Sequence, residues 1–335
     1  ITSIITCLTM FSSQSIDVNI SLTSLEMLWK VYDQMMRGQN GSESAKQEIF
    51  NITTTQLLGL SMDMRPEIRH CAMNTLFAAL TMTANASLTT GGQWKQIFDD
   101  VIFPLFERAG ERSNQAMQSK EEASAPELKK GKKMILHHSR DTAHKQWSET
   151  RVLALRGLAR VVKTCAVLLI QENWFRSTWA TALEVCKKAT EDAMQDQEVA
   201  LASFGVMFAM LKIVSEDSFK AMWKIEKEID EQTQICRNDM WLMTWVAVND
   251  AAKFEGHCPD VALHICQNLV TIYEASIEKE FTQIQNMQDI CNTIVSLSRP
   301  RVIIDNNSGE SKATIDMQLY RQIIDFVKIL QPKDV

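Results

Sequence analysis

Small and apolar residues recur along this chain with the spacing of one helix face. The pattern places an apolar or β-branched residue first, a small residue four positions later and an apolar residue eight positions later. Its clearest copies are Ile20/Ser24/Leu28, Ile68/Ala72/Leu76, Thr150/Ala154/Leu158 and Val199/Ser203/Met207. Residues four apart share a helix face, and a small central residue lets a second helix approach closely. The pattern therefore predicts helices that pack on one another through equivalent faces.

The four copies recur with a period that is typical of helical repeats. They begin at residues 20, 68, 150 and 199, so they are separated by 48, 82 and 49 residues. The two short separations lie just above the ~40–47 residues of HEAT and armadillo units, and the long one indicates an insertion or an atypical unit. Arg69 and Arg151 follow the first position of the pattern, which strengthens the likeness to the second helix of a HEAT unit. Two fainter copies would extend the array to six units: Met240/Thr244/Val248 and Met287/Cys291/Val295.

Helical segments are expected along most of the chain. Periodicity and start signals place them at 1–13, 18–37, 43–61, 66–84, 92–110, 142–163, 174–192, 195–214 and 217–232. Asp17 and Ser42 are expected N-caps, and Pro66 is expected in the first turn of its helix. Further helices are expected after turns at 236–239 and 258–260. A last amphipathic helix is expected to contain Ile315, Leu319, Ile323, Phe326 and Ile329.

Two polar stretches interrupt this helical pattern. Residues 110–133 show no apolar periodicity and are predicted to form an exposed, mobile loop, and residues 298–312 are predicted to form a second loop. Neither stretch divides the chain, so residues 1–335 are predicted to form one continuous α-solenoid of stacked antiparallel helix pairs. Because the chain begins at Ile1, inside an expected helix, we expect it to be a soluble piece of a longer protein.

The composition supports an all-α fold and excludes several classes of function. The chain has 335 residues, of which 45% are hydrophobic, and only 11 Gly and 6 Pro, too few for the many turns of a sheet protein. A net charge of −6 argues against a general nucleic-acid binder. The longest apolar run, 200–211, is shorter than the ~18–20 residues of a membrane span. Eight scattered cysteines without a C-x-x-C pair favour a reducing compartment.

The residues that could carry chemistry do not form a recognisable site. His137, His138 and His144 contain metal-binding atoms, but adjacent helix residues point in different directions and no tetrahedral set is completed. The spacing from Cys258 to Cys266 is not that of a zinc finger. The chain has no nucleophile elbow, P-loop, dinucleotide-binding glycine motif or H-E-x-x-H. We therefore expect no enzyme activity and no cofactor, and a zinc-dependent enzyme is the alternative from another class.

Two further groups of residues have both a functional and a structural interpretation. The basic run Lys129, Lys130, Lys132 and Lys133 is either a site for anionic lipid headgroups or the solvated edge of a loop. Seven tryptophans are either binding hot spots or core residues, and their apolar helical neighbours favour the core. They are Trp94, Trp147, Trp174, Trp179, Trp223, Trp241 and Trp245.

One irregular segment resembles a family signature. Residues 137–150 read H-H-S-R-D-T-A-H-K-Q-W-S-E-T and closely resemble a signature of the monensin-sensitivity (Mon) family of Golgi and endosomal trafficking scaffolds. Similar matches lie in the same order, at D-V-N-I-S-L-T-S with Leu28-Trp29, at R-P-E-I-R with T-L-F, and at F-P-L. They begin at Asp17, Arg65, Thr75 and Phe103, and the resemblance covers residues 15–215.

The resemblance implies a function without catalysis. Mon proteins are similar to the regulatory helical regions of the BIG-class large Arf guanine-nucleotide exchange factors but lack their exchange domain. A member would be a cytoplasmic scaffold, peripheral on trans-Golgi and endosome membranes, that works with Dopey-family proteins and Arf-like small GTPases. Two alternatives stay open: the regulatory helical region of a true Arf exchange factor, and an unrelated cytosolic HEAT-repeat scaffold.

The same segment supplies the candidate binding residues. Local stability alone does not require so polar a run beside a core helix, so part of it is predicted to form or hold a partner-binding ridge. The alternative is that its charged residues only cap and connect adjacent helices. The candidate residues are His138, Arg140, Asp141, Lys145, Gln146, Trp147 and Glu149.

Overall fold

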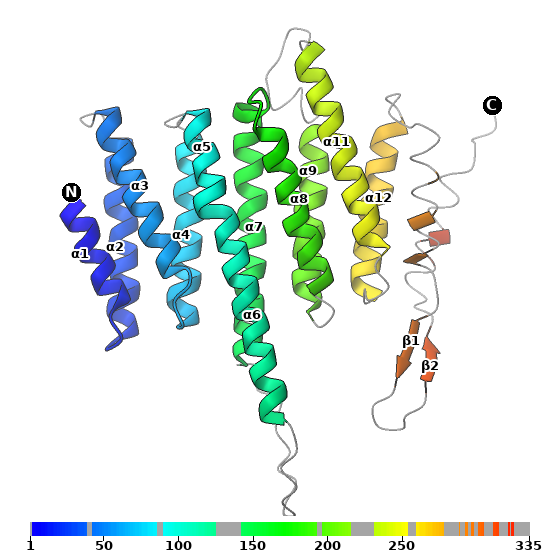
Figure 1. Cartoon of the computed structure of the whole chain (residues 1–335), viewed down its shortest axis with the longest axis horizontal. Helices are drawn as coiled ribbons and strands as arrows, with labels where there is room; N and C mark the ends of the chain where they lie inside the picture. Colours follow the sequence, from blue (N-terminus) through cyan, green and yellow to red (C-terminus); the bar gives the residue numbers. More distant parts are fainter. Residues whose placement is uncertain are drawn as a thin grey trace, which may run out of the picture.

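A computed structural model describes residues 2–38, 42–85, 90–124, 142–192, 196–215, 231–253 and 259–277, with short pieces between 288 and 324. Its helices form two layers along the length of the molecule (Figure 1). The first layer contains α1 (Thr2–Ser13), α3 (Glu43–Leu60), α5 (Gly91–Ile97) with the π-helical turn η1 (Phe98–Ile102) and α6 (Phe103–Ser124), α8 (Phe175–Asp192) and α11 (Glu231–Ala252). The second layer contains α2 (Val18–Arg37), α4 (Pro66–Asn85), α7 (Ala143–Leu169), α9 (Gln197–Val214) and α12 (Pro259–Ile277).

Each second-layer helix packs on the next one along the chain. α2 contacts α4, α4 contacts α7, α7 contacts α9, and α9 contacts α12. First-layer helices cover these contacts, with α1 on α2, α3 on α4, α6 on α7 and α8 on α9. One hydrophobic cluster runs through the array from Ile5 to Leu297. The predicted all-α, HEAT/armadillo-like solenoid is confirmed. That residues 1–335 form a single continuous domain stays a prediction.

The repeated pattern lies at the centre of this packing. All three of its residues on α4, α7 and α9 are fully buried. On α2, Leu28 is fully buried and Ser24 is buried with 7% of its surface exposed. Ile20 is the exception, with 47% of its surface exposed. The prediction that the copy at Met240 continues the series needs correction, because these buried residues lie on α11 of the first layer. The copy at 287–295 lies largely outside the described residues.

The predicted helix starts are correct where the structure describes them. The Asp17 carboxylate accepts a hydrogen bond from the Asn19 backbone N–H at 2.8 Å, and the Ser42 hydroxyl accepts one from the Ala45 N–H at 3.2 Å. Each side chain thereby pairs one of the N–H groups that a helix start leaves without a backbone acceptor. Pro66 opens α4, where its missing N–H costs nothing.

Two predictions placed irregular structure where the chain is helical. The loop expected at 110–133 is helical up to Ser124, since α6 continues through a run of Glu, Arg, Gln, Ala and Lys, all strong helix formers. Its residues 125–133 lie outside the described part. The turn expected at 236–239 is the interior of α11, in which Arg237 is buried.

The predicted loop at 298–312 also needs correction. Strand β1 (Arg301–Ile304) pairs antiparallel with β2 (Ser311–Thr314), so that Arg301 lies opposite Thr314. β-Branched residues are enriched in strands, and the first strand contains three of them in a row, Val302, Ile303 and Ile304. The helix expected at 217–232 lies almost entirely outside the described residues, and the last predicted helix does so apart from a few positions.

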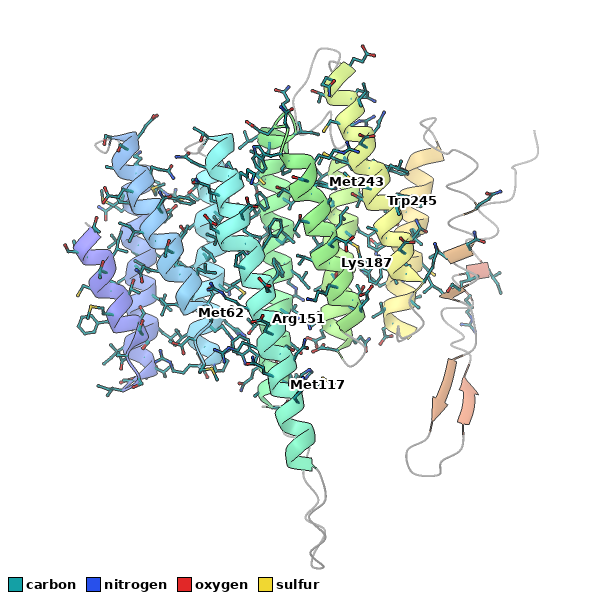
Figure 2. All side chains as sticks on the ribbon, in the orientation of Figure 1. Met62, Met117, Arg151, Lys187, Met243 and Trp245 are labelled. Atoms are coloured by element: carbon teal, nitrogen blue, oxygen red, sulfur yellow. The ribbon has the colours of Figure 1, made fainter. Side chains whose placement is uncertain are left out.

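Apolar side chains fill the space between the layers, and the largest fully buried ones include three tryptophans. Figure 2 shows the side chains on the ribbon, with the buried Trp245 of α11 labelled. Trp94, Trp147, Trp179 and Trp245 are buried, and Trp174 and Trp241 are half-buried, so the core interpretation of the tryptophans is confirmed for the described ones. Among described helices, only α9 is long and apolar enough to cross a membrane, and 61% of it is buried inside the array. This burial is what a central core helix requires.

Candidate functional site

The segment that resembles a family signature ends in the first turns of α7. Lys145, Gln146, Trp147 and Glu149 are described, whereas His138, Arg140 and Asp141 lie outside the described residues, as do Lys129, Lys130, Lys132 and Lys133. The Thr142 hydroxyl caps α7 by accepting a hydrogen bond from the Lys145 backbone N–H at 3.3 Å. The cap fixes where α7 begins and hence the direction in which Lys145 and Glu149 project.

Trp147 is buried beneath an arginine of α4. The guanidinium carbon of Arg69 lies 4.0 Å from the centre of the Trp147 ring, a cation–π contact between two buried side chains. Trp147 therefore anchors the start of α7 from below and is not part of the exposed surface. Lys145 and Glu149 are exposed on the same two turns. The structure thus separates an anchoring residue of the segment from residues that a partner can reach.

Arg69 itself connects three parts of the array. Its Nε donates to the Thr150 hydroxyl at 2.7 Å, its Nη1 to the Asp63 carbonyl at 2.7 Å, and its Nη2 to the Gln146 carbonyl at 3.3 Å. The planar guanidinium thereby joins the α3–α4 turn, α4 and α7. A lysine has a single nitrogen and could not donate in three such separate directions as well. In the sequence, Arg69 only strengthens the likeness to a HEAT repeat. Its connecting role depends on its complete burial between helices, which the sequence does not show.

The neighbouring Arg65 performs the same role one unit earlier. Its Nη1 donates to the Gln14 carbonyl at 2.6 Å and its Nη2 to the Ser12 carbonyl at 3.1 Å, which connects the α1–α2 turn to the α3–α4 turn. It also pairs with Asp63, with Nη2 and Oδ2 at 2.8 Å. Burial alone would raise the pKa of Asp63, but the hydrogen bonds and charge of Arg65 outweigh burial and lower it. The two arginines of the R-P-E-I-R motif thus connect neighbouring helix pairs by hydrogen bonds.

A hollow lies where the starts of α7 and α9 face each other. It has a volume of about 580 Å³, and we call it the junction hollow. Its lining residues are His144, Lys145, Ser148, Glu149, Asp196, Gln197, Glu198 and Leu201. Within the described part of the chain, the side chains of Lys145, Glu149 and Glu198 form no ion pair or hydrogen bond, and the buried Ser148 hydroxyl has no partner. The three charged side chains are exposed and are therefore available to a polar partner.

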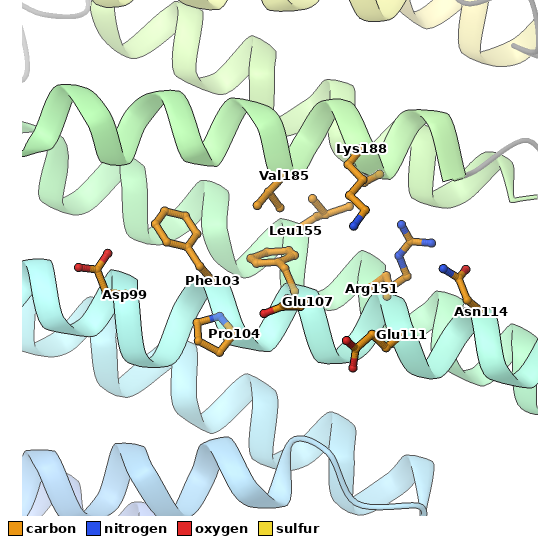
Figure 3. A pocket seen from close by; sticks show the side chains of 13 residues that line it. Asp99, Phe103, Pro104, Glu107, Glu111, Asn114, Arg151, Leu155, Val185 and Lys188 are labelled. Carbon is orange, nitrogen blue, oxygen red and sulfur yellow. The ribbon is translucent and has the colours of Figure 1, made fainter.

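A second hollow of about 420 Å³ lies between α6, α7 and α8 (Figure 3). Phe103, Leu155 and Val185 form an apolar part of its lining, while Arg151 and Lys188 project into the same space. Glu107 and Glu111 line it from α6. This mixed surface is suited to a side chain with both apolar and charged parts. The sequence pattern does not predict this hollow, although the arginine that follows Thr150 in the repeat, Arg151, lines it.

The described residues contain no group of three His, Cys, Asp or Glu side chains that could hold a metal ion. His137, His138, His257 and Cys258 lie outside the described part. His264 is half-buried against Phe208, with ring centres 6.1 Å apart in an edge-on arrangement, which suits a core residue.

Comparison with known proteins gives matches within one group. A family model described as the C-terminal region of Mon2 protein matches residues 51–227. The Protein MON2 homolog of Drosophila melanogaster is 28% identical over 254 residues, which cover 70% of this chain and 14% of the relative. The homolog of Homo sapiens is 31% identical over 233 residues, covering 61% of this chain and 13% of the relative.

A third relative, the Monensin-resistant homolog 2 of Caenorhabditis elegans, is 27% identical over 184 residues, covering 55% of this chain and 10% of that protein. The chain thus spans only 10–14% of the length of these relatives. No solved structure matches it.

Proposed function

Since the chain belongs to the Mon2 family, whose C-terminal-region model matches residues 51–227, we propose that it is a non-catalytic scaffold region acting in Golgi and endosomal membrane trafficking. Family membership sets aside the unrelated HEAT-repeat scaffold and favours Mon2 over an Arf exchange factor. The extended helical array supports a binding role, because stacked helix pairs offer a long surface and no enclosed catalytic pocket.

The observation that carries this proposal is the position of the signature segment. Trp147 is fixed beneath Arg69, while Lys145 and Glu149 are exposed at the rim of the junction hollow. A buried anchor that holds exposed charges in place is the arrangement expected of a recognition site. We propose that a protein partner binds at this rim and that His138, Arg140 and Asp141 of the same segment contribute to the contact.

The partners and location follow from the family resemblance. We propose a Dopey-family protein and an Arf-like GTPase as partners, and peripheral attachment of the whole protein to trans-Golgi and endosome membranes. The basic run at 129–133 would add contacts with anionic lipids, at about 1 kcal/mol for each favourably placed lysine.

A double substitution tests the site. Arg140→Ala with Lys145→Ala should abolish capture of a purified Dopey-family protein by the immobilised chain while leaving the melting temperature unchanged. The matched control is Lys30→Ala with Lys95→Ala, which removes two charges from exposed ion pairs with Glu26 and Asp99 elsewhere on the array. A melting temperature lowered by several degrees with capture intact would show that the segment is only architectural. The same capture with an Arf-like GTPase tests the second partner.

A further inference from the structure

The first helix pair carries apolar residues on the side that faces away from the array. We call this surface the end face. On α1 it contains Ile4, Cys7 and Phe11, which follow the i, i+3, i+7 spacing of one helix face, and all three are exposed. Beside them, Ile20 and Met27 of α2 are about half exposed. Isolated exposed apolar residues need no explanation, but two adjacent helices with an apolar outer side do.

Both helices already bury a different face in the array. Ile5 and Thr9 of α1 are buried, as are Leu25 and Leu28 of α2. Both helices therefore have exposed apolar residues in addition to the faces that they bury. A helix pair that closes a solenoid has a polar outer side, because nothing packs on it. α1 and α2 instead resemble an interior pair of the array.

The register of the repeat shows what the end face is suited to receive. Ile20 is the first position of the repeated pattern, and the equivalent Ile68, Thr150 and Val199 are all fully buried. The contact of Thr150 is known in detail: its hydroxyl accepts from Arg69 Nε at 2.7 Å and lies 3.3 Å from His70 Nε2. Both partners are on α4, the second-layer helix that precedes α7. The first position of α7 thus faces the preceding unit, and in α2 this place is held by Ile20.

We propose that the end face binds another helix pair of the same repeat type, supplied by polypeptide outside residues 1–335. The contact would continue the series already made by α2 with α4, α4 with α7 and α7 with α9. Sequence for such a pair exists in the related proteins, since the part that matches this chain is only 13–14% of the fly and human proteins.

The charge of the end face disfavours a membrane as the occupant. Helices that lie on a membrane combine an apolar face with Lys or Arg on the polar side. α1 contains no charged residue at all, in the sequence T-S-I-I-T-C-L-T-M-F-S-S. An apolar helix without basic residues instead suits contact with another protein surface.

The thiol of Cys7 provides a direct test, because it lies in the end face and is exposed. Its alkylation by a maleimide should be measured by peptide mass spectrometry in the 335-residue chain and in the complete polypeptide that contains it. We expect labelling at least tenfold slower in the complete polypeptide. The control is the thiol introduced by Met64→Cys, at a position 68% exposed before α4, which should react equally fast in both.

Two variants sharpen the result. In the complete polypeptide, Ile20→Glu should restore fast labelling of Cys7, whereas Met64→Glu should not. Equal labelling rates for Cys7 in the short and complete chains would overturn the proposal. So would protection of Cys7 in the short chain that grows with protein concentration and disappears with Ile20→Glu, since a second copy would then be the occupant.

Discussion

At the scale of single residues, hydrogen bonds from two arginine side chains connect neighbouring helix pairs, and the repeated sequence pattern does not predict these bonds. Arg65 ends the turn before α4 and Arg69 lies in the first turns of that helix, and each donates to carbonyl oxygens of a different neighbouring segment. Arg69 is fully buried, and burial lowers its pKa, an effect that Asp63 opposes. A buried guanidinium requires several acceptors, and here two turns and one helix supply them.

Gly157 is a residue at which α4 and α7 approach too closely for a side chain. A Cβ atom at this position would overlap with the ring of Phe77, which is itself buried in the core. Gly157→Ala is therefore expected to lower the free energy of unfolding by about 1–3 kcal/mol, since the ring has nowhere to move. Chemical denaturation followed by circular dichroism measures this change.

The matched control is Gly205→Ala in the middle of α9, where a Cβ atom would have no neighbour within 4 Å. Alanine favours the helix over glycine by about 0.5–1 kcal/mol, so this variant should be more stable than the parent. A destabilising Gly205→Ala, or a neutral Gly157→Ala, would contradict the close packing of α4 on α7.

At the scale of helices, the second layer depends on the small central residue of the repeat. Ala72, Ala154 and Ser203 are fully buried, and the Ser203 hydroxyl donates to the Cys186 carbonyl of α8 at 2.6 Å. Small residues at these positions let adjacent helices pack closely, and a polar one is tolerated where a backbone acceptor lies within reach. The same rule explains the buried Thr244 of α11, whose hydroxyl donates to the Met240 carbonyl at 2.7 Å and accepts from Trp179 Nε1 at 2.8 Å.

Ala72→Asp tests this contact between helices. It would bury a carboxylate without a partner between α4 and its neighbours, and we expect a loss of several kcal/mol of unfolding free energy. Ala143→Asp introduces the same side chain at an exposed position in the first turn of α7, where the helix dipole favours negative charge. Thermal unfolding should show a strongly lowered midpoint for the first variant and little change for the second. Similar midpoints for the two would refute the repeat-face assignment.

At the scale of the whole molecule, the array lacks a single centre, and its stability is distributed over successive junctions. Two half-buried histidines lie at different points along it, His70 on α4 and His264 on α12. Burial lowers the pKa of both, and the charge of Arg69 lowers that of His70 further, against weaker opposing effects of Glu149 and Glu67. Both histidines therefore remain neutral in the folded chain at a pH where they are protonated in the unfolded chain.

This difference predicts a pH dependence of stability. Above the unfolded pKa of 6.5, both histidines are neutral in the folded and the unfolded chain, so they do not reduce the free energy of unfolding. As the pH falls below 6.5 toward the lowered folded values, the unfolded chain binds more protons, so the free energy of unfolding decreases. Replacing both by Gln should flatten this decrease below pH 6.5 in urea unfolding experiments. An unchanged slope would show that neither histidine is responsible.

What the sequence determined by itself was most of the helices in the described part of the chain and their inward faces. Hydrogen bonds within a helix join residues four apart, and so do the repeated apolar positions, so both can be identified locally. Asp17, Ser42 and Pro66 marked helix starts for the same reason. Where periodicity was absent, between 110 and 124, the local preference of each residue for the helix still decided the outcome, and the periodic pattern alone missed it.

Only the tertiary structure decided which of these positions are covered, paired or left open. Trp147 is buried because Arg69, 78 residues earlier, lies over its ring, and the junction hollow combines Glu149 with Glu198 from another helix. Ile20 and Ile68 occupy the same place in the repeat, yet one is half exposed and the other fully buried. Burial and charge pairing depend on segments that are distant along the chain, and the pattern of one helix contains no information about which neighbour will stand beside it.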